Sequence, residues 1–134
     1  MEMTQMYEST ILALGAMALL MFAQLIFADM VGIKSKHPPG GLVATDHKNL
    51  LFRATRTVAN TNESVAIFVL AALFCILSST SPNLTAYASW GFVAARLLYA
   101  VCYYNNFQVL RSVIFGISLL FILALLLIGL AVWL

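Results

Sequence analysis

Four long apolar stretches alternate with short polar breaks along the chain. A helix needs about 20 mostly apolar residues to cross the hydrocarbon core of a bilayer. Each stretch reaches that length, so the pattern predicts transmembrane helices over about residues 10–31, 46–78, 84–104 and 109–134. Short connections make consecutive helices antiparallel neighbours. We therefore expect an all-α membrane protein, in which residues 1–134 form a single up-down bundle of four transmembrane helices.

The polar breaks predict where the helices end. The first break contains Lys-His-Pro-Pro-Gly-Gly over residues 36–41, and adjacent prolines and glycines do not continue a helix. Thr45 and Asp46 then have the side-chain type that caps a helix N-terminus, so either is a candidate cap for the second helix. Pro82 lies in the second break, where we expect a tight turn.

The composition excludes a soluble globular domain. Of the 134 residues, 63% are hydrophobic and 9% are charged, whereas a soluble domain is about half apolar and about a quarter charged. The net charge is only +2 and the basic residues form no run, so we expect no nucleic-acid partner. Two isolated loop histidines, His37 and His47, make a poor metal site, since zinc takes three or four ligands, and we expect no metal.

The distribution of basic residues predicts the orientation in the membrane. The second break and both termini carry no basic residue. The basic residues that flank the first and third breaks are Lys34, Lys36, Lys48, Arg53, Arg56 and Arg111. By the positive-inside rule, the first and third loops are cytoplasmic and both termini lie on the non-cytoplasmic side. The short loops and the lack of a targeting signal favour a bacterial inner membrane over the endoplasmic reticulum.

Polar residues inside the second helix require a specific role. Arg53, Arg56, Asn60 and Glu63 follow one another at spacings of three, four and three residues, so they share one helical face. A charge within the membrane costs roughly 2.5–3.5 kcal/mol on insertion scales. This face is therefore expected to look into the bundle or into a subunit interface.

The third and fourth helices place further polar groups at the same depth. Arg96, Tyr99 and Tyr103 share one face of the third helix, and Arg111 and Ser112 begin the fourth. Arg96 lies about 12 Å from the inner end of its helix and can extend its side chain inward. We therefore predict an ion pair between Arg96 and Glu63 of the second helix.

This group of side chains suits a small, flexible, anionic ligand. Arginines bind carboxylates with two parallel hydrogen bonds, while Asn60 and Glu63 can bind an ammonium or an amide. Glutathione has carboxylates, an ammonium, amides and a thiol. A guanidinium at the start of a helix would favour the thiolate form of that thiol, which makes Arg111 the candidate catalytic residue.

Structural explanations of the same residues remain open. The seam of polar residues could simply fix the register of the helices. Arg53 could bind lipid phosphate groups, and Tyr103 and Tyr104 could belong to the belt of aromatic residues at the membrane interface.

The second-helix motif Arg53-Ala-Thr-Arg56-Thr-Val-Ala-Asn60-Thr-Asn-Glu63 resembles the signature of the MAPEG superfamily, the membrane-associated proteins in eicosanoid and glutathione metabolism. The segments Ala-Arg-Leu-Leu-Tyr-Ala-Val-Cys-Tyr over residues 95–103 and Leu-Arg-Ser over residues 110–112 are similar to the third and fourth helices of that family. A tyrosine found one turn into the fourth helix of some members is Phe115 here.

The resemblance implies a homotrimer that binds glutathione between neighbouring subunits near the cytoplasmic face. Arg111 would stabilise the thiolate, and the substrate-binding residues would be Arg53, Arg56, Asn60, Glu63, Arg96, Tyr99, Tyr103 and Ser112. The implied function is a membrane glutathione transferase or peroxidase that acts on lipophilic electrophiles and contacts membrane lipids. The alternative is a non-catalytic lipid-binding or accessory membrane protein of the same fold.

Overall fold

The computed structural model describes residues 2–134, and every regular element in that range is helical. A short helix, α1 (Glu2–Met6), precedes four long ones: α2 (Glu8–Lys34), α3 (Leu50–Leu77), α4 (Pro82–Tyr104) and α5 (Gln108–Leu130). Each of α2 to α5 is long and apolar enough to cross a membrane. The protein is therefore a multi-pass integral membrane protein, and the expected four-helix bundle is confirmed. The short helix α1 was not predicted.

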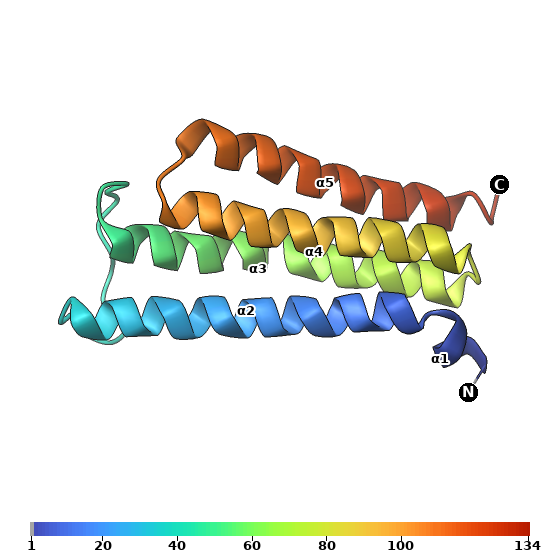
Figure 1. Cartoon of the computed structure of the whole chain (residues 1–134), viewed down its shortest axis with the longest axis horizontal. Helices are drawn as coiled ribbons and strands as arrows, with labels where there is room; N and C mark the ends of the chain where they lie inside the picture. The colour runs from blue at the N-terminus through green and yellow to red at the C-terminus, as the bar shows by residue number, and fades with distance from the viewer. Residues whose placement is uncertain (1) are drawn as a thin grey trace.

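The four long helices run alternately up and down (Figure 1). The loop after α2 and the turn after α4 lie at one end of the bundle, and both termini lie at the other end with the turn after α3. We call the first end the basic end, because Lys34, Lys36, Lys48 and Arg111 lie there. We call the second the terminal end.

The start of the second long helix differs from the expectation. The helix begins at Leu50, because Asn49 is the N-cap and its side-chain oxygen accepts a hydrogen bond from the Leu51 N–H at 2.9 Å. The carboxylate of Asp46 does not reach the helix. It accepts a hydrogen bond from the Lys48 N–H at 2.9 Å within the loop. Neither Thr45 nor Asp46 caps the helix, so that prediction was wrong.

The two middle helices carry most of the buried surface. In the most apolar 18 residues of each helix, the buried share is 44% in α3 and 50% in α4. It is only 22% in α2 and 28% in α5. The rings of Phe68 and Phe92 stack between α3 and α4 with centroids 4.3 Å apart, and both are fully buried. Large apolar side chains are exposed along α2 and α5, among them Leu19, Phe22, Leu120 and Leu127. Such a surface is stable in lipid or against another subunit, but not in water.

Hydrogen bonds fasten the terminal end. The Tyr7 hydroxyl donates to the Thr80 carbonyl, and the indole N–H groups of Trp90 and Trp133 donate to Ser9 and Ser78 at 3.1 Å and 2.9 Å. Cys75 and Cys102 are both buried and free.

Two glycines allow close helix contacts. A Cβ at Gly91 would collide with the ring of Phe121, and one at Gly129 with the ring of Phe74. The absence of a side chain at these positions therefore lets α5 approach both α4 and α3, as small residues do in membrane bundles.

We expect Gly91→Ala and Gly129→Ala each to lower the free energy of unfolding by about 1–3 kcal/mol, because the added methyl group overpacks the helix contact. Gly116→Ala is the matched control on α5, since a Cβ there meets nothing within 4 Å. It should cause no loss, because alanine favours the helix by about 1 kcal/mol over glycine. Denaturant titration in detergent measures all three, and equal effects would contradict the packing explanation.

Candidate functional site

The deepest charge in the bundle is that of Arg96 on α4. Its side chain is fully buried, and its Nη2 donates to the Asn60 side-chain oxygen at 2.8 Å and to the Thr61 hydroxyl at 3.0 Å. The guanidinium carbon also lies 4.4 Å from the centre of the Tyr99 ring. Two further nitrogens, Nε and Nη1, are buried without a hydrogen-bond partner among residues 2–134. Arg96 is thus held by neutral oxygens and an aromatic face.

The predicted ion pair between Glu63 and Arg96 does not form. In the described part of the chain the salt bridge is Arg56–Glu63, with 2.9 Å between Nη1 and Oε1. Seven residues are nearly two whole turns, so Arg56 and Glu63 lie only about 20° apart around α3, whereas Asn60 lies about 60° from Glu63. The amide therefore faces α4, and the carboxylate faces outward.

Asn60 links the buried charge to the surface pair. Its Oδ1 accepts from Arg96, and its Nδ2 donates to the Glu63 Oε2 over a long 3.4 Å. The side chains of Arg56 and Glu63 are 42% and 54% exposed, so both can reach a ligand or a neighbouring subunit. The result is a chain of four polar side chains that runs from inside the bundle to its surface.

A second cluster lies at the start of α5. The Arg111 guanidinium carbon stands 4.1 Å from the centre of the Tyr103 ring, and Nη1 lies 3.3 Å from the His47 Nδ1. Tyr103 in turn packs edge-to-face against Tyr99, with centroids 5.5 Å apart. Both tyrosines are nearly fully buried, at 4% and 5% exposure. These rings connect Arg111 to Arg96.

Two residues that were predicted to bind the ligand, Arg53 and Ser112, instead make hydrogen bonds to backbone carbonyls of the same subunit. Arg53 donates through Nη1 to the carbonyls of His47 and Lys48, at 2.7 Å and 2.9 Å, and through Nε to the Tyr104 carbonyl at 3.2 Å. It therefore ties the first loop to α3 and α4. The Ser112 hydroxyl is exposed and donates to the Gln108 carbonyl of its own helix at 3.1 Å.

Two contacts were not foreseen from the sequence. Thr61 is the second oxygen bound to Arg96, and threonine after asparagine in a helix gives no signal for that role. The sequence predicts an ordinary loop residue at His47, yet its side chain contacts Arg111. Its position shortly before the second helix was the only hint.

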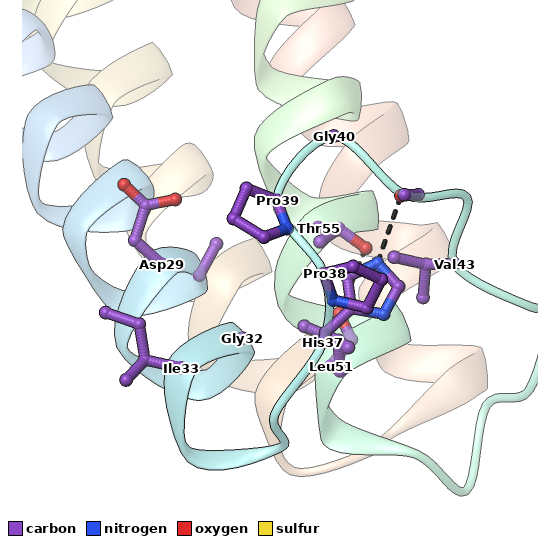
Figure 2. Close-up of a pocket in the computed structure, with 12 residues that line it drawn as sticks. Asp29, Gly32, Ile33, His37, Pro38, Pro39, Gly40, Val43, Leu51 and Thr55 are labelled. Atoms are coloured by element: carbon purple, nitrogen blue, oxygen red, sulfur yellow. Dashed lines mark hydrogen bonds between the residues drawn. The ribbon is translucent and has the colours of Figure 1, made fainter.

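A separate hollow of about 410 Å³ lies at the basic end between α2, α3 and the loop that joins them. Figure 2 shows Pro38, Pro39 and Gly40 crossing between the two helices, with Leu51 and Thr55 on α3. The His37 Nε2 lies 3.0 Å from the Gly41 carbonyl and closes the loop on itself. None of the predicted site residues lines this hollow, and most of its wall is apolar.

The chemistry of the polar clusters is that of anion binding. Arginines, an amide, phenols and the Glu63 carboxylate are present, and within residues 2–134 no three His, Cys, Asp or Glu side chains come together as a metal would require. The clusters can orient an anionic ligand and stabilise negative charge on it.

We expect Asn60→Leu to lower the free energy of unfolding by about 2–4 kcal/mol, because it removes an acceptor from a buried guanidinium. Asn62→Leu is the matched control, since Asn62 is an exposed amide on the same helix. It should change the free energy by less than about 0.5 kcal/mol. Denaturant titration in detergent distinguishes the two, and a harmless Asn60→Leu would show that Arg96 does not depend on this amide.

Comparison with known proteins identifies the family. The sequence model of the MAPEG family matches residues 10–131, which include α2 from its third residue onward, the whole of α3, α4 and α5, and both polar clusters. The chain matches no curated protein and no solved structure. Members of the family use glutathione, and the family broadly covers membrane glutathione transferase and eicosanoid-type functions. The match over nearly the whole chain and the four-helix membrane fold together show that this protein belongs to the MAPEG family.

Proposed function

We propose that the protein is a membrane glutathione transferase, or a peroxidase that uses the same thiol, and that it acts on lipophilic electrophiles. The observation that carries the proposal is the position of Arg111, in the first turn of α5 and over the Tyr103 ring. Family membership supports glutathione as the co-substrate. The positive-inside rule supports a cytoplasmic basic end, and we retain the bacterial inner membrane as the proposed location.

The exposed side chains of α3 fit the ends of glutathione. Arg56 uses Nη1 for Glu63, and a guanidinium has four more N–H donors that can bind a carboxylate. Glu63 is half-exposed and can accept from an ammonium. Because both side chains lie on the outside of the single subunit, we propose a homotrimer in which glutathione binds between neighbouring subunits.

Arg111 would act on the thiol. A guanidinium and a helix N-terminus both stabilise a nearby anion, so the thiol loses its proton to water more readily and is held as the thiolate. The thiolate sulfur then forms a bond to the electrophilic carbon, and the bond to the leaving group breaks with its electron pair.

Apolar surface beside Arg111 could receive the electrophile. At least half of the residue surface is exposed at Val109, Leu110 and Val113. Residues 106–110 line an open hollow of about 480 Å³. A lipophilic substrate dissolved in the bilayer could therefore reach the thiolate without crossing water.

A specific observation also favours the second candidate, lipid binding without catalysis. The hollow of about 410 Å³ between α2 and α3 is mostly apolar and contains none of the residues assigned to glutathione. It could take an acyl chain, with Asp29 beside it to bind a cationic head group. In that case Arg111 would be dispensable.

We expect millimolar glutathione to stabilise the detergent-purified protein against thermal unfolding. A ligand at 100 times its Kd contributes about 2.7 kcal/mol to the free energy of unfolding. Arg56→Ala should abolish the shift, whereas Lys36→Ala, which removes an exposed basic side chain at the same end, should preserve it. No shift in an intact oligomer would favour the lipid-binding function.

Catalysis is tested with chlorodinitrobenzene as the electrophile, and conjugate formation is followed by absorbance. Arg111→Ala should lower the rate by at least about 100-fold while the oligomer and the glutathione-induced shift persist, because electrostatic stabilisation of a developing or bound anion contributes on this scale. An unchanged rate would remove Arg111 from the reaction.

A further inference from the structure

The side chain of His47 makes contacts that an ordinary loop residue does not make. Its ring is half-buried, packs edge-on against Phe52 with centroids 5.0 Å apart, and lies 6.2 Å from the Tyr103 ring. Its Nδ1 is 3.3 Å from the Arg111 Nη1. Arginine can only donate hydrogen bonds, so the His47 Nδ1 must accept, and the neutral ring carries its proton on Nε2.

The backbone of His47 is held as well. The Arg53 Nη1 donates to the His47 carbonyl at 2.7 Å and to the next carbonyl, that of Lys48, at 2.9 Å. The same guanidinium reaches the Tyr104 carbonyl of α4. The end of the loop is therefore tied to two helices, and the imidazole has a defined place beside α5.

These contacts restrict Arg111 from two sides. The Arg111 guanidinium carbon lies over the Tyr103 ring, 4.1 Å from the ring centre, and the His47 Nδ1 accepts from one of the terminal guanidinium nitrogens. A free arginine side chain has many rotamers, and fixing it before the ligand arrives removes that entropic cost from the binding step.

We propose that His47 is a positioning residue, which fixes the Arg111 guanidinium over the Tyr103 ring in the orientation that faces a bound thiol. The part of this proposal that concerns the thiol rests on the proposed function. The part that concerns the order of the Arg111 side chain does not. Arg53 contributes indirectly, because it holds the loop segment that presents the imidazole.

Two variants separate the acceptor atom from the rest of the ring. His47→Asn places an amide oxygen one bond from Cγ, where Nδ1 stands in histidine, and so retains an acceptor. His47→Leu places a methyl group there and retains none. Both variants lose the ring contacts with Phe52 and Tyr103, so the difference between them reports the hydrogen bond to Arg111.

The first measurement needs no ligand. Nitrogen relaxation of the Arg111 Nε–H group, assigned with Arg111→Lys, should show an ordered side chain in the wild-type protein and in His47→Asn. In His47→Leu the group should be mobile, with the unfolding temperature unchanged between the two variants. An Arg111 side chain that stays equally ordered in His47→Leu would overturn the proposal.

The second measurement uses saturating glutathione and the ultraviolet absorbance of its thiolate. His47→Leu should lower the rate of conjugation about 10- to 100-fold and reduce the thiolate signal, because a small misplacement of a catalytic group has effects of this size. His47→Asn should restore most of both. If the wild-type protein forms no thiolate while the Arg111 order still depends on His47, the proposed function fails and the positioning role stands.

Discussion

The buried guanidinium of Arg96 is the constraint on which the rest of the polar architecture depends. An unpaired charge inside a bundle is destabilising, and this one makes no contact with a carboxylate in the described chain. Two neutral oxygens and the face of Tyr99 hold it instead. These groups come from α3 and α4, so the arrangement fixes the register of the two central helices and also orients Asn60 toward the surface pair.

The consequence is that Glu63 stays at the surface. Had the carboxylate turned inward to Arg96, Arg56 would have lost its partner and the outer face of α3 would carry an unbalanced cation. With Asn60 as the intermediate, the negative charge of Glu63 acts on Arg96 through a polarised amide, while the carboxylate itself remains half-exposed. The buried charge of Arg96 and the accessible ion pair of Arg56 and Glu63 are thus linked through the side chain of Asn60.

The sequence predicts the four spans well, because lipid demands long apolar runs and the polar breaks between them are short. It predicts the start of α3 less well, because Thr45, Asp46 and Asn49 all have side chains that can cap, and only the path of the loop decides among them. Helical spacing groups Asn60 with Glu63, yet it does not resolve the difference of about 60° that sends one inward and the other outward. The role of His47 could not be predicted, since periodicity says nothing about loop conformation.

The four arginines near the basic end divide by what their donors contact. Arg96 and Arg53 are used within the subunit, one by side-chain oxygens in the core and one by backbone carbonyls of the loop and α4. Arg56 and Arg111 keep donors that a ligand can use, since within residues 2–134 each makes a single polar side-chain contact. A motif that appears in the sequence as one uniform basic site is therefore two systems: an inner pair that builds the end of the bundle, and an outer pair that an anionic ligand can still bind. Because the inner pair sets the positions of Asn60 and His47, the geometry of the outer pair depends on residues that need never touch the ligand.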